Sequence, residues 1–232
     1  MLPVIRLEAP DMRFASIYER AVARKGGEQA LLALLPPVLQ TEVLRQRSDD
    51  RYLAEITRCI FRAGFVWRVI DNKWPDFEAA FEGFVPAYWQ QVPPDVLEAL
   101  GRDTRVVRNM QKINTVPDNA RMIVDMAREH GSFGHFLADW PADDQAGLLL
   151  WLKRNGARLG GNTAQYFLRM VGWDGFILSN DVVAVLRREQ LLDASPGSKK
   201  ALQQAQQAFN QWHTETGLPY THLSRIAAYS VE

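Results

Sequence analysis

The sequence contains a single cysteine, Cys59, among its 232 residues, so no intramolecular disulfide can form. The absence of disulfides fits a reducing compartment. The chain also lacks an apolar run long enough to cross a membrane, and its N-terminus lacks the apolar region of a secretion signal. We therefore expect a soluble cytoplasmic protein in which Cys59 is a small buried side chain rather than a nucleophile.

Net charge is absent too, because 27 lysines and arginines balance 27 aspartates and glutamates. A chain of this kind has no global attraction to nucleic acid, so any such binding needs a local basic patch. The sequence has no phosphate-binding loop of the Walker type, no dinucleotide fingerprint and no serine-nucleophile elbow. Its four histidines show no metal-ligand spacing, so we expect neither a metal nor a cofactor.

Helical periodicity is the main positive signal. Apolar residues make up 47% of the chain, which is enough for a core, and they recur at helical spacing between glycines and prolines. No alternating strand pattern stands out. The sequence predicts an all-α protein of about ten to twelve short helices in a compact, two-lobed body. We divide it into an N-terminal arm and helices at 1–48 (with the arm at 1–12), a core at 49–192, and C-terminal helices at 193–232.

Residues 153–185 hold the most informative pattern. One helix ends at Gly156, where we expect a glycine cap. Gly160 and Gly161 then precede a second helix that begins at Asn162 and Thr163 and buries one face. That face carries Ala164, Phe167, Leu168 and Val171.

The chemistry of this glycine hairpin is anion binding. Glycines let backbone N–H groups approach a ligand closely, and a helix N-terminus has unpaired N–H donors. Together they suit a phosphate, and Lys153, Arg154 and Arg158 add positive charge. The alternative is an ordinary tight connection between two core helices.

Four blocks of the sequence, at residues 61–67, 107–121, 156–163 and 180–183, follow one another in a fixed order. Together they resemble the 3-methyladenine DNA glycosylase I family of the helix-hairpin-helix DNA glycosylases. The resemblance covers about residues 50–190 and implies an all-helical glycosylase fold. It also implies double-stranded DNA with a damaged base as the partner, a monomer, and a place in the cytoplasm or nucleoid.

The resemblance assigns roles to particular residues. The hairpin residues Arg158, Gly160, Gly161, Asn162 and Thr163 would grip DNA. Trp67 would stack on an extruded base, because an aromatic face attracts a cationic alkylated purine. Phe65 matches a leucine that enters the gap left by that base. For both aromatics the alternative is a place in the core.

Asp181 matches the family's active-site aspartate. It would stabilise positive charge developing on the sugar or activate water. The alternative is a helix N-cap, which is a common role for aspartate before an apolar helix. Asn162 stands where bifunctional relatives carry a Schiff-base lysine, so the resemblance implies a monofunctional enzyme.

Two departures from the family's pattern stand out. The family has a pocket glutamate eight positions before the tryptophan, where this chain has Cys59, and Glu55 one turn earlier is the nearest substitute. The family's structural zinc needs two cysteines and two histidines, which this chain cannot supply. We expect a divergent glycosylase that releases alkylated purine bases like 3-methyladenine in base-excision repair. The rival is a non-catalytic helix-hairpin-helix module that binds damaged or bent DNA.

Overall fold

The computed structural model describes residues 14–231, so the arm expected at 1–12 lies outside the described residues. All regular structure in 14–231 is helical, which confirms the all-α prediction. The described chain has sixteen α-helices and one 3₁₀ helix, more than the ten to twelve expected. Several of them have only four to seven residues, such as α7 (Pro86–Trp89), and helices this short show little periodicity in a sequence.

Contacts between residues divide the chain into two compact units. Unit 1 comprises residues 1–39, 141–147 and 174–232, and unit 2 comprises 40–140 and 148–173. Both are discontinuous in sequence. The two units group residues by their contacts, which does not show which segments fold alone. The domain boundaries expected at residues 48 and 192 therefore stay predictions.

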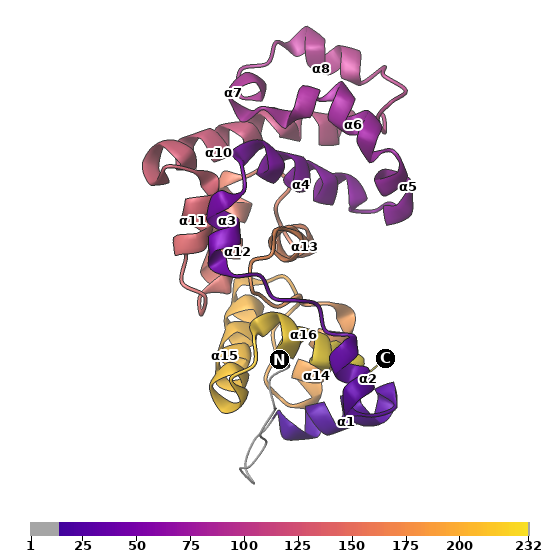
Figure 1. Cartoon of the computed structure of the whole chain (residues 1–232), viewed down its shortest axis with the longest axis vertical. Helices are drawn as coiled ribbons and strands as arrows, with labels where there is room; N and C mark the ends of the chain where they lie inside the picture. Colours follow the sequence, from indigo (N-terminus) through magenta and orange to yellow (C-terminus); the bar gives the residue numbers. More distant parts are fainter. Residues whose placement is uncertain (1–13, 232) are drawn as a thin grey trace. The chain divides into compact units, whose positions relative to one another are not determined.

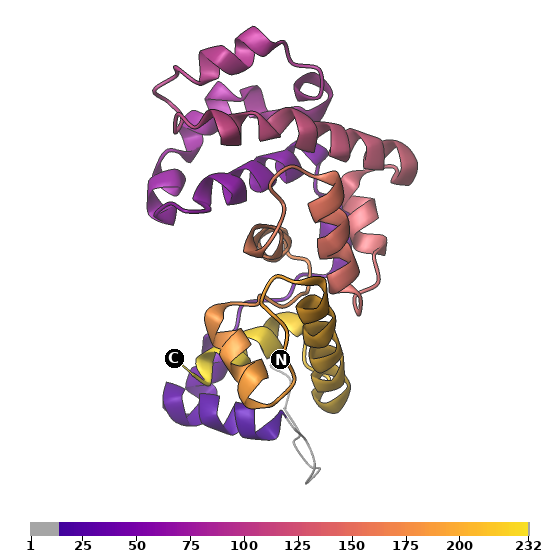
Figure 2. The same cartoon turned by 180° about the vertical axis from the view of Figure 1, so that it is seen from behind.

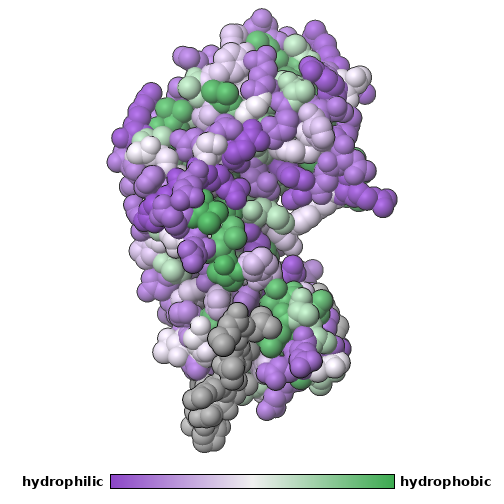
Figure 3. All heavy atoms as spheres, in the orientation of Figure 1, coloured by the Kyte–Doolittle hydropathy of each residue, from purple (hydrophilic) through white to green (hydrophobic). Residues whose placement is uncertain are grey.

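Unit 2 holds α3 to α11 and α13, and it contains most of α12 (Figures 1 and 2). The helices are α3 (Thr41–Gln46), α4 (Asp49–Arg62), α5 (Trp67–Asn72), α6 (Trp74–Ala80), η1 (Glu82–Phe84), α7, α8 (Pro94–Leu100), α9 (Met110–Ile113), α10 (Thr115–His130), α11 (Phe133–Asp139), α12 (Gln145–Asn155) and α13 (Asn162–Val171). Hydrophilic residues cover much of the face of this unit that Figure 3 shows, with small apolar groups between them.

Helix α4 is the centre of unit 2 and packs against α10, α11 and α13. Its residues Leu53, Ile56 and Ile60 are buried, whereas Ala63, which continues the same helical spacing, lies past the end of the helix and is exposed. The ring of Tyr52 meets Phe133 of α11 and Phe167 of α13 edge-on, with ring centroids 5.4 and 6.4 Å apart. This aromatic packing fixes α13, the helix after the hairpin, against α4.

Unit 1 contains α1 (Ala15–Lys25), α2 (Glu28–Ala33), α14 (Asn180–Arg188), α15 (Lys199–Thr216) and α16 (Tyr220–Tyr229). Its core includes the stacked rings of Phe176 and Phe209, whose centroids lie 4.5 Å apart. Helix α14 packs on α16, and α1 packs on the same helix. The ion pair of Arg20 with Glu189, at 2.7 Å, joins α1 to the end of α14. These contacts hold the segment that carries Asp181.

No helix within residues 14–231 is both long and apolar enough to cross a membrane.

Candidate active site

A cavity of about 270 Å³ opens in unit 2 between the end of α4 and the start of α13. We call it the aromatic pocket. Its walls come from the last turn of α4, from residues 61–67 at the end of that helix, which we call the pocket strip, and from the first turns of α13. The lining residues are Cys59, Arg62, Ala63, Gly64, Phe65, Trp67, Asn162, Thr163 and Tyr166. The structure thus brings together the strip and the hairpin helix, which lie about a hundred residues apart in the sequence.

Trp67 and Phe65 both lie at the surface and line the aromatic pocket. Their exposed fractions are 37% and 42%, so neither is a core side chain, and the core alternative is wrong for both. The rings of Trp67 and of Tyr166 on α13 lie at nearly a right angle to each other, with centroids 4.9 Å apart. Exposing two large aromatics costs hydrophobic free energy, which a bound ligand would recover.

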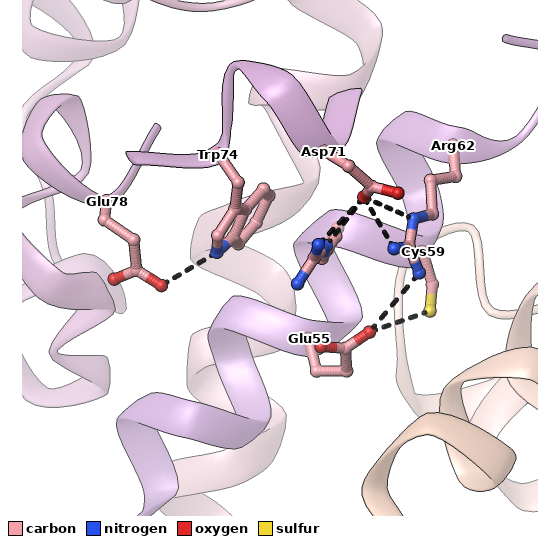
Figure 4. Close-up of polar contacts among 7 residues, drawn as sticks. Glu55, Cys59, Arg62, Asp71, Trp74 and Glu78 are labelled. Carbon is pink, nitrogen blue, oxygen red and sulfur yellow. Dashed lines mark hydrogen bonds and ion pairs between the residues drawn. The ribbon is translucent and has the colours of Figure 1, made fainter. Parts of the chain in front are cut away.

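Charged side chains of α4 and α5 form a cluster around Asp71 (Figure 4). Both Arg58 and Arg62 donate to Oδ1 of Asp71 on α5, Arg58 Nη2 at 2.9 Å. Partial burial raises the pKa of Asp71, but these hydrogen bonds outweigh it and hold that pKa below its ordinary value. The guanidinium of Arg62 lies over the ring of Trp67, 4.9 Å from its centroid, so one face of Trp67 is already covered.

Cys59 and Glu55 sit one helical turn apart on α4, as Figure 4 shows. Cys59 lines the aromatic pocket, and burial raises the pKa of its thiol, so the group is neutral. Its Sγ–H donates to Glu55 Oε1 at 3.7 Å. Glu55 is not among the residues that line the pocket; its Oε1 lies 3.8 Å from Arg62 Nη1. The role of Glu55 in base binding stays a prediction.

The hairpin occupies residues 156–161 between α12 and α13, and its basic residues are exposed. Gly161 has φ 57° and ψ −136°, a conformation that essentially only glycine adopts without strain. Arg158 also has a positive φ, of 56°, and its Nη2 donates to Gln111 Oε1 at 2.6 Å. Lys153 and Arg154 lie in the last turn of α12. Lys153, Arg154 and Arg158 are all exposed, and their role in DNA binding stays a prediction.

Gly156 follows α12, but the reason differs from the expected cap. It is not among the residues with positive φ. A Cβ at this position would lie 2.6 Å from Leu159 Cδ1 and 3.0 Å from Asn119 Oδ1. Close packing of the hairpin on α10, and not a left-handed cap, requires glycine here.

Two buried polar residues that the sequence analysis left without a role position the site. Lys112 donates from Nζ to the carbonyls of Phe61 and Ala63, at 3.0 and 2.6 Å, and lies 4.7 Å from the centroid of the Phe65 ring. Burial lowers the pKa of Lys112, and nearby Arg158 adds to this shift. Lys112 thus ties the pocket strip to α9.

Asn119 is fully buried on α10 and clamps the hairpin. Its Nδ2 donates to Ala157 O at 3.2 Å, and its Oδ1 accepts from Ala157 N at 2.9 Å. The sequence held one sign of this role, a polar side chain on an otherwise apolar helical face. Such a group must find a hydrogen-bond partner inside the fold.

Asp181 lies in the first turn of α14 in unit 1. The N-cap of α14 is Ser179, whose Oγ accepts from Val182 N at 3.3 Å, so the cap alternative for Asp181 is wrong. Its carboxylate is half-buried and has no hydrogen bond or ion pair with any residue from 14 to 231.

Within the same described range, no three histidine, cysteine, aspartate or glutamate side chains gather as metal ligands would.

Comparisons place this architecture among DNA glycosylases. The 8-oxoguanine DNA glycosylase of Methanocaldococcus jannaschii matches with a TM-score of 0.52 at 17% identity, over 90% of each chain. The 8-oxoguanine glycosylase/lyase from the same organism, solved with DNA, matches at 0.50 and 16% identity, over 92% of this chain and 96% of the other. A variant of 3-methyladenine DNA glycosylase I from Staphylococcus aureus matches at 0.50 and 18% identity, over 66% and 91%. The fold is that of a helical DNA glycosylase.

The sequence narrows this class to a family. Residues 43–147 match the model of the methyladenine glycosylase family, a range that includes the pocket strip, Lys112 and Asn119. The match covers 105 of the 232 residues, just under half of the chain, and over that range the chain is similar to DNA glycosylases of base-excision repair.

Proposed function

We propose that the protein is a monofunctional glycosylase that releases alkylated purine bases from double-stranded DNA. The observation that carries the proposal is the aromatic pocket, where Trp67 and Phe65 stay exposed beside the hairpin helix. A glycosylase must extrude its target nucleotide and hold the base in a pocket of this kind. The volume of about 270 Å³ is at the lower end of the range for small-ligand sites, which suits a single base.

Trp67 is the proposed stacking surface, through the face that Arg62 does not cover. Stacking of a base on an aromatic side chain contributes about 1–3 kcal/mol. Phe65 is the proposed wedge, since apolar side chains commonly fill an unstacked step in DNA. Lys112 fixes the backbone that precedes Phe65, because its Nζ donates to the carbonyls of Phe61 and Ala63.

The hairpin is the proposed DNA grip. Backbone N–H groups at Gly160, Gly161 and the start of α13 would bind a phosphate, with Asn162 and Thr163 beside them. Lys153, Arg154 and Arg158 would contribute charge, which makes binding salt-dependent because phosphate contacts release counterions. All three basic side chains are exposed, which supports a local basic patch in a chain that has no net charge.

Asp181 is the proposed catalytic carboxylate. Asn162 occupies the hairpin position where bifunctional relatives carry a lysine. A carboxylate with no ion pair among the described residues remains available to stabilise positive charge on a deoxyribose during bond cleavage. Without a Schiff-base lysine at that position, the product would be an intact abasic strand. We further propose that the enzyme acts as a monomer without a cofactor, in the cytoplasm or nucleoid.

A base-release assay on methylated duplex DNA tests the proposal. We expect free methylated purines in the supernatant and strand breaks only after alkaline treatment. Breaks that form without alkali would contradict the monofunctional assignment. Tight binding to methylated duplex without release of any base would instead identify the non-catalytic binding module.

A further inference from the structure

Arg158 of the hairpin has a left-handed backbone, with φ 56°, although it is not a glycine. A residue with a Cβ adopts this conformation only where the surrounding structure enforces it. The neighbours on both sides do so here, because Asn119 bonds the N–H and C=O of Ala157 and the side chain of Leu159 is buried. Strained residues of this kind cluster at functional sites. The backbone thus sets the direction in which the Arg158 side chain leaves the hairpin.

The side chain of Arg158 is held in place as well, although it is exposed. Its Nη2 donates at 2.6 Å to Oε1 of Gln111 on α9, a residue that lies 47 positions earlier in the sequence. Within residues 14–231, neither Nε nor Nη1 of Arg158 has a hydrogen bond or an ion pair. The guanidinium is therefore anchored through one nitrogen, and the other two can donate to a ligand.

The anchor of Arg158 is a neutral amide, which leaves the positive charge of the guanidinium uncompensated. Several other arginines of the described chain pair with carboxylates, as Arg51 does with Glu78 at 2.8 Å. A carboxylate partner would oppose the charge and occupy donors that an incoming anion needs. The amide of Gln111 fixes the guanidinium without this competition, so Arg158 keeps its full attraction for an anion.

Helix α9 joins this anchored cation to the pocket strip. Gln111 bonds Arg158, and the next residue, Lys112, bonds two backbone carbonyls of the strip. The Nζ of Lys112 also lies 4.7 Å from the centroid of the Phe65 ring. Two consecutive residues of one short helix thus hold a hairpin cation and the strip that carries the proposed wedge. Arg158 is thereby fixed on the side of the hairpin next to the strip.

We propose that Gln111 is a positioning residue, which holds the guanidinium of Arg158 in place for one DNA phosphate beside the pocket strip. A guanidinium binds phosphate through parallel N–H donors, so its orientation matters more than that of a lysine ammonium. Holding the side chain before DNA arrives removes much of the rotamer freedom that binding would otherwise restrict. The proposal rests on the glycosylase function proposed above and assigns a role to a residue outside the hairpin.

A double-mutant cycle of DNA affinity tests the proposal. Fluorescence anisotropy measures the binding of wild type, Gln111→Ala, Arg158→Met and the double variant to a duplex that carries an uncleavable abasic-site analogue. Arg158→Met keeps an unbranched side chain and removes the charge, so the slope of log affinity against log salt should fall by about one. Gln111→Ala should weaken binding by about three- to tenfold in wild type and should add no further loss to Arg158→Met.

The cycle separates positioning from the alternatives. An equal loss on Gln111→Ala in both backgrounds would mean that Gln111 contacts DNA itself or supports the fold, and the proposal would fail. Unchanged affinity of Gln111→Ala would also overturn it. Asn114→Ala is the matched control, because Asn114 is an exposed amide just beyond α9 whose side chain does not cap α10. The control should bind DNA as wild type does, and a loss equal to that of Gln111→Ala would contradict a specific role for Gln111.

Base release by the wild-type protein distinguishes failure of this proposal from failure of the function. The expected cycle, together with no release of any base from methylated duplex, would refute the glycosylase function and retain the positioning role of Gln111. Release of bases by wild type, together with an affinity that Gln111→Ala leaves unchanged, would refute the positioning role and retain the function.

Discussion

Replacement of Asn119 by alanine should destabilise the protein by loosening the hairpin. Asn119 makes two hydrogen bonds to the backbone of Ala157 and is fully buried. Each bond contributes about 1 kcal/mol net, and the Ala157 N–H and C=O groups lose these partners. Because Ala157 is only half-buried, water can reach part of that backbone. We therefore expect a loss of about 2–3 kcal/mol in the free energy of unfolding.

Urea unfolding followed by circular dichroism measures this loss, with Asn155→Ala as the control. Asn155 lies at the end of α12, next to the hairpin, and its exposed amide donates to Trp151 O at 2.8 Å. An exposed amide of this kind should contribute within about 0.5 kcal/mol. If the two variants unfold at the same urea concentration, Asn119 does not clamp the hairpin and the reasoning fails.

Three further predictions concern DNA binding, catalysis and metal. Gly161→Asp should weaken binding to duplex DNA of any sequence in fluorescence anisotropy at low salt. Gly161→Ala, which shares the backbone strain without the charge, should weaken it less, and equal affinity of the aspartate variant and wild type would refute the phosphate site. Asp181→Asn should lower the single-turnover rate of base release by about a hundredfold or more and spare binding to damaged DNA; an unchanged rate would remove Asp181 from the mechanism. Elemental analysis should find no stoichiometric zinc in protein purified without added metal, and one zinc per chain with loss of helicity on chelation would contradict this.

The sequence predicted the local structure of the hairpin region well. Helix α13 spans Asn162–Val171 and ends at Gly172 in the left-handed conformation, and its four predicted apolar residues are buried. These features depend on side chains within one or two turns of each other, so periodicity and glycine position suffice to find them. Ser179, and not Asp181, caps α14, because a serine and an aspartate two positions apart are both good caps and only geometry decides between them.

The contacts that shape the site could not be predicted from the sequence, because they join distant segments. Lys112 bonds carbonyls about fifty residues earlier, and Asn119 bonds a backbone group thirty-eight residues later. Gly156 looks like a helix cap in the sequence, but its role is to allow close packing against Leu159 and Asn119. The sequence shows the chemical type of each of these residues, but it does not show which distant residue each one contacts.

Cys59 and Arg62 both line the aromatic pocket. By the resemblance, Cys59 stands where the family has its pocket glutamate, and Arg62, in the block at residues 61–67, stands where the family has a glutamine. The first change removes a hydrogen-bond acceptor and a negative charge, and the second replaces a group that donates and accepts with one that only donates. Trp67 and Phe65 stay exposed beside both changes. We therefore expect the two changes to alter which base is bound more than the stacking that holds it.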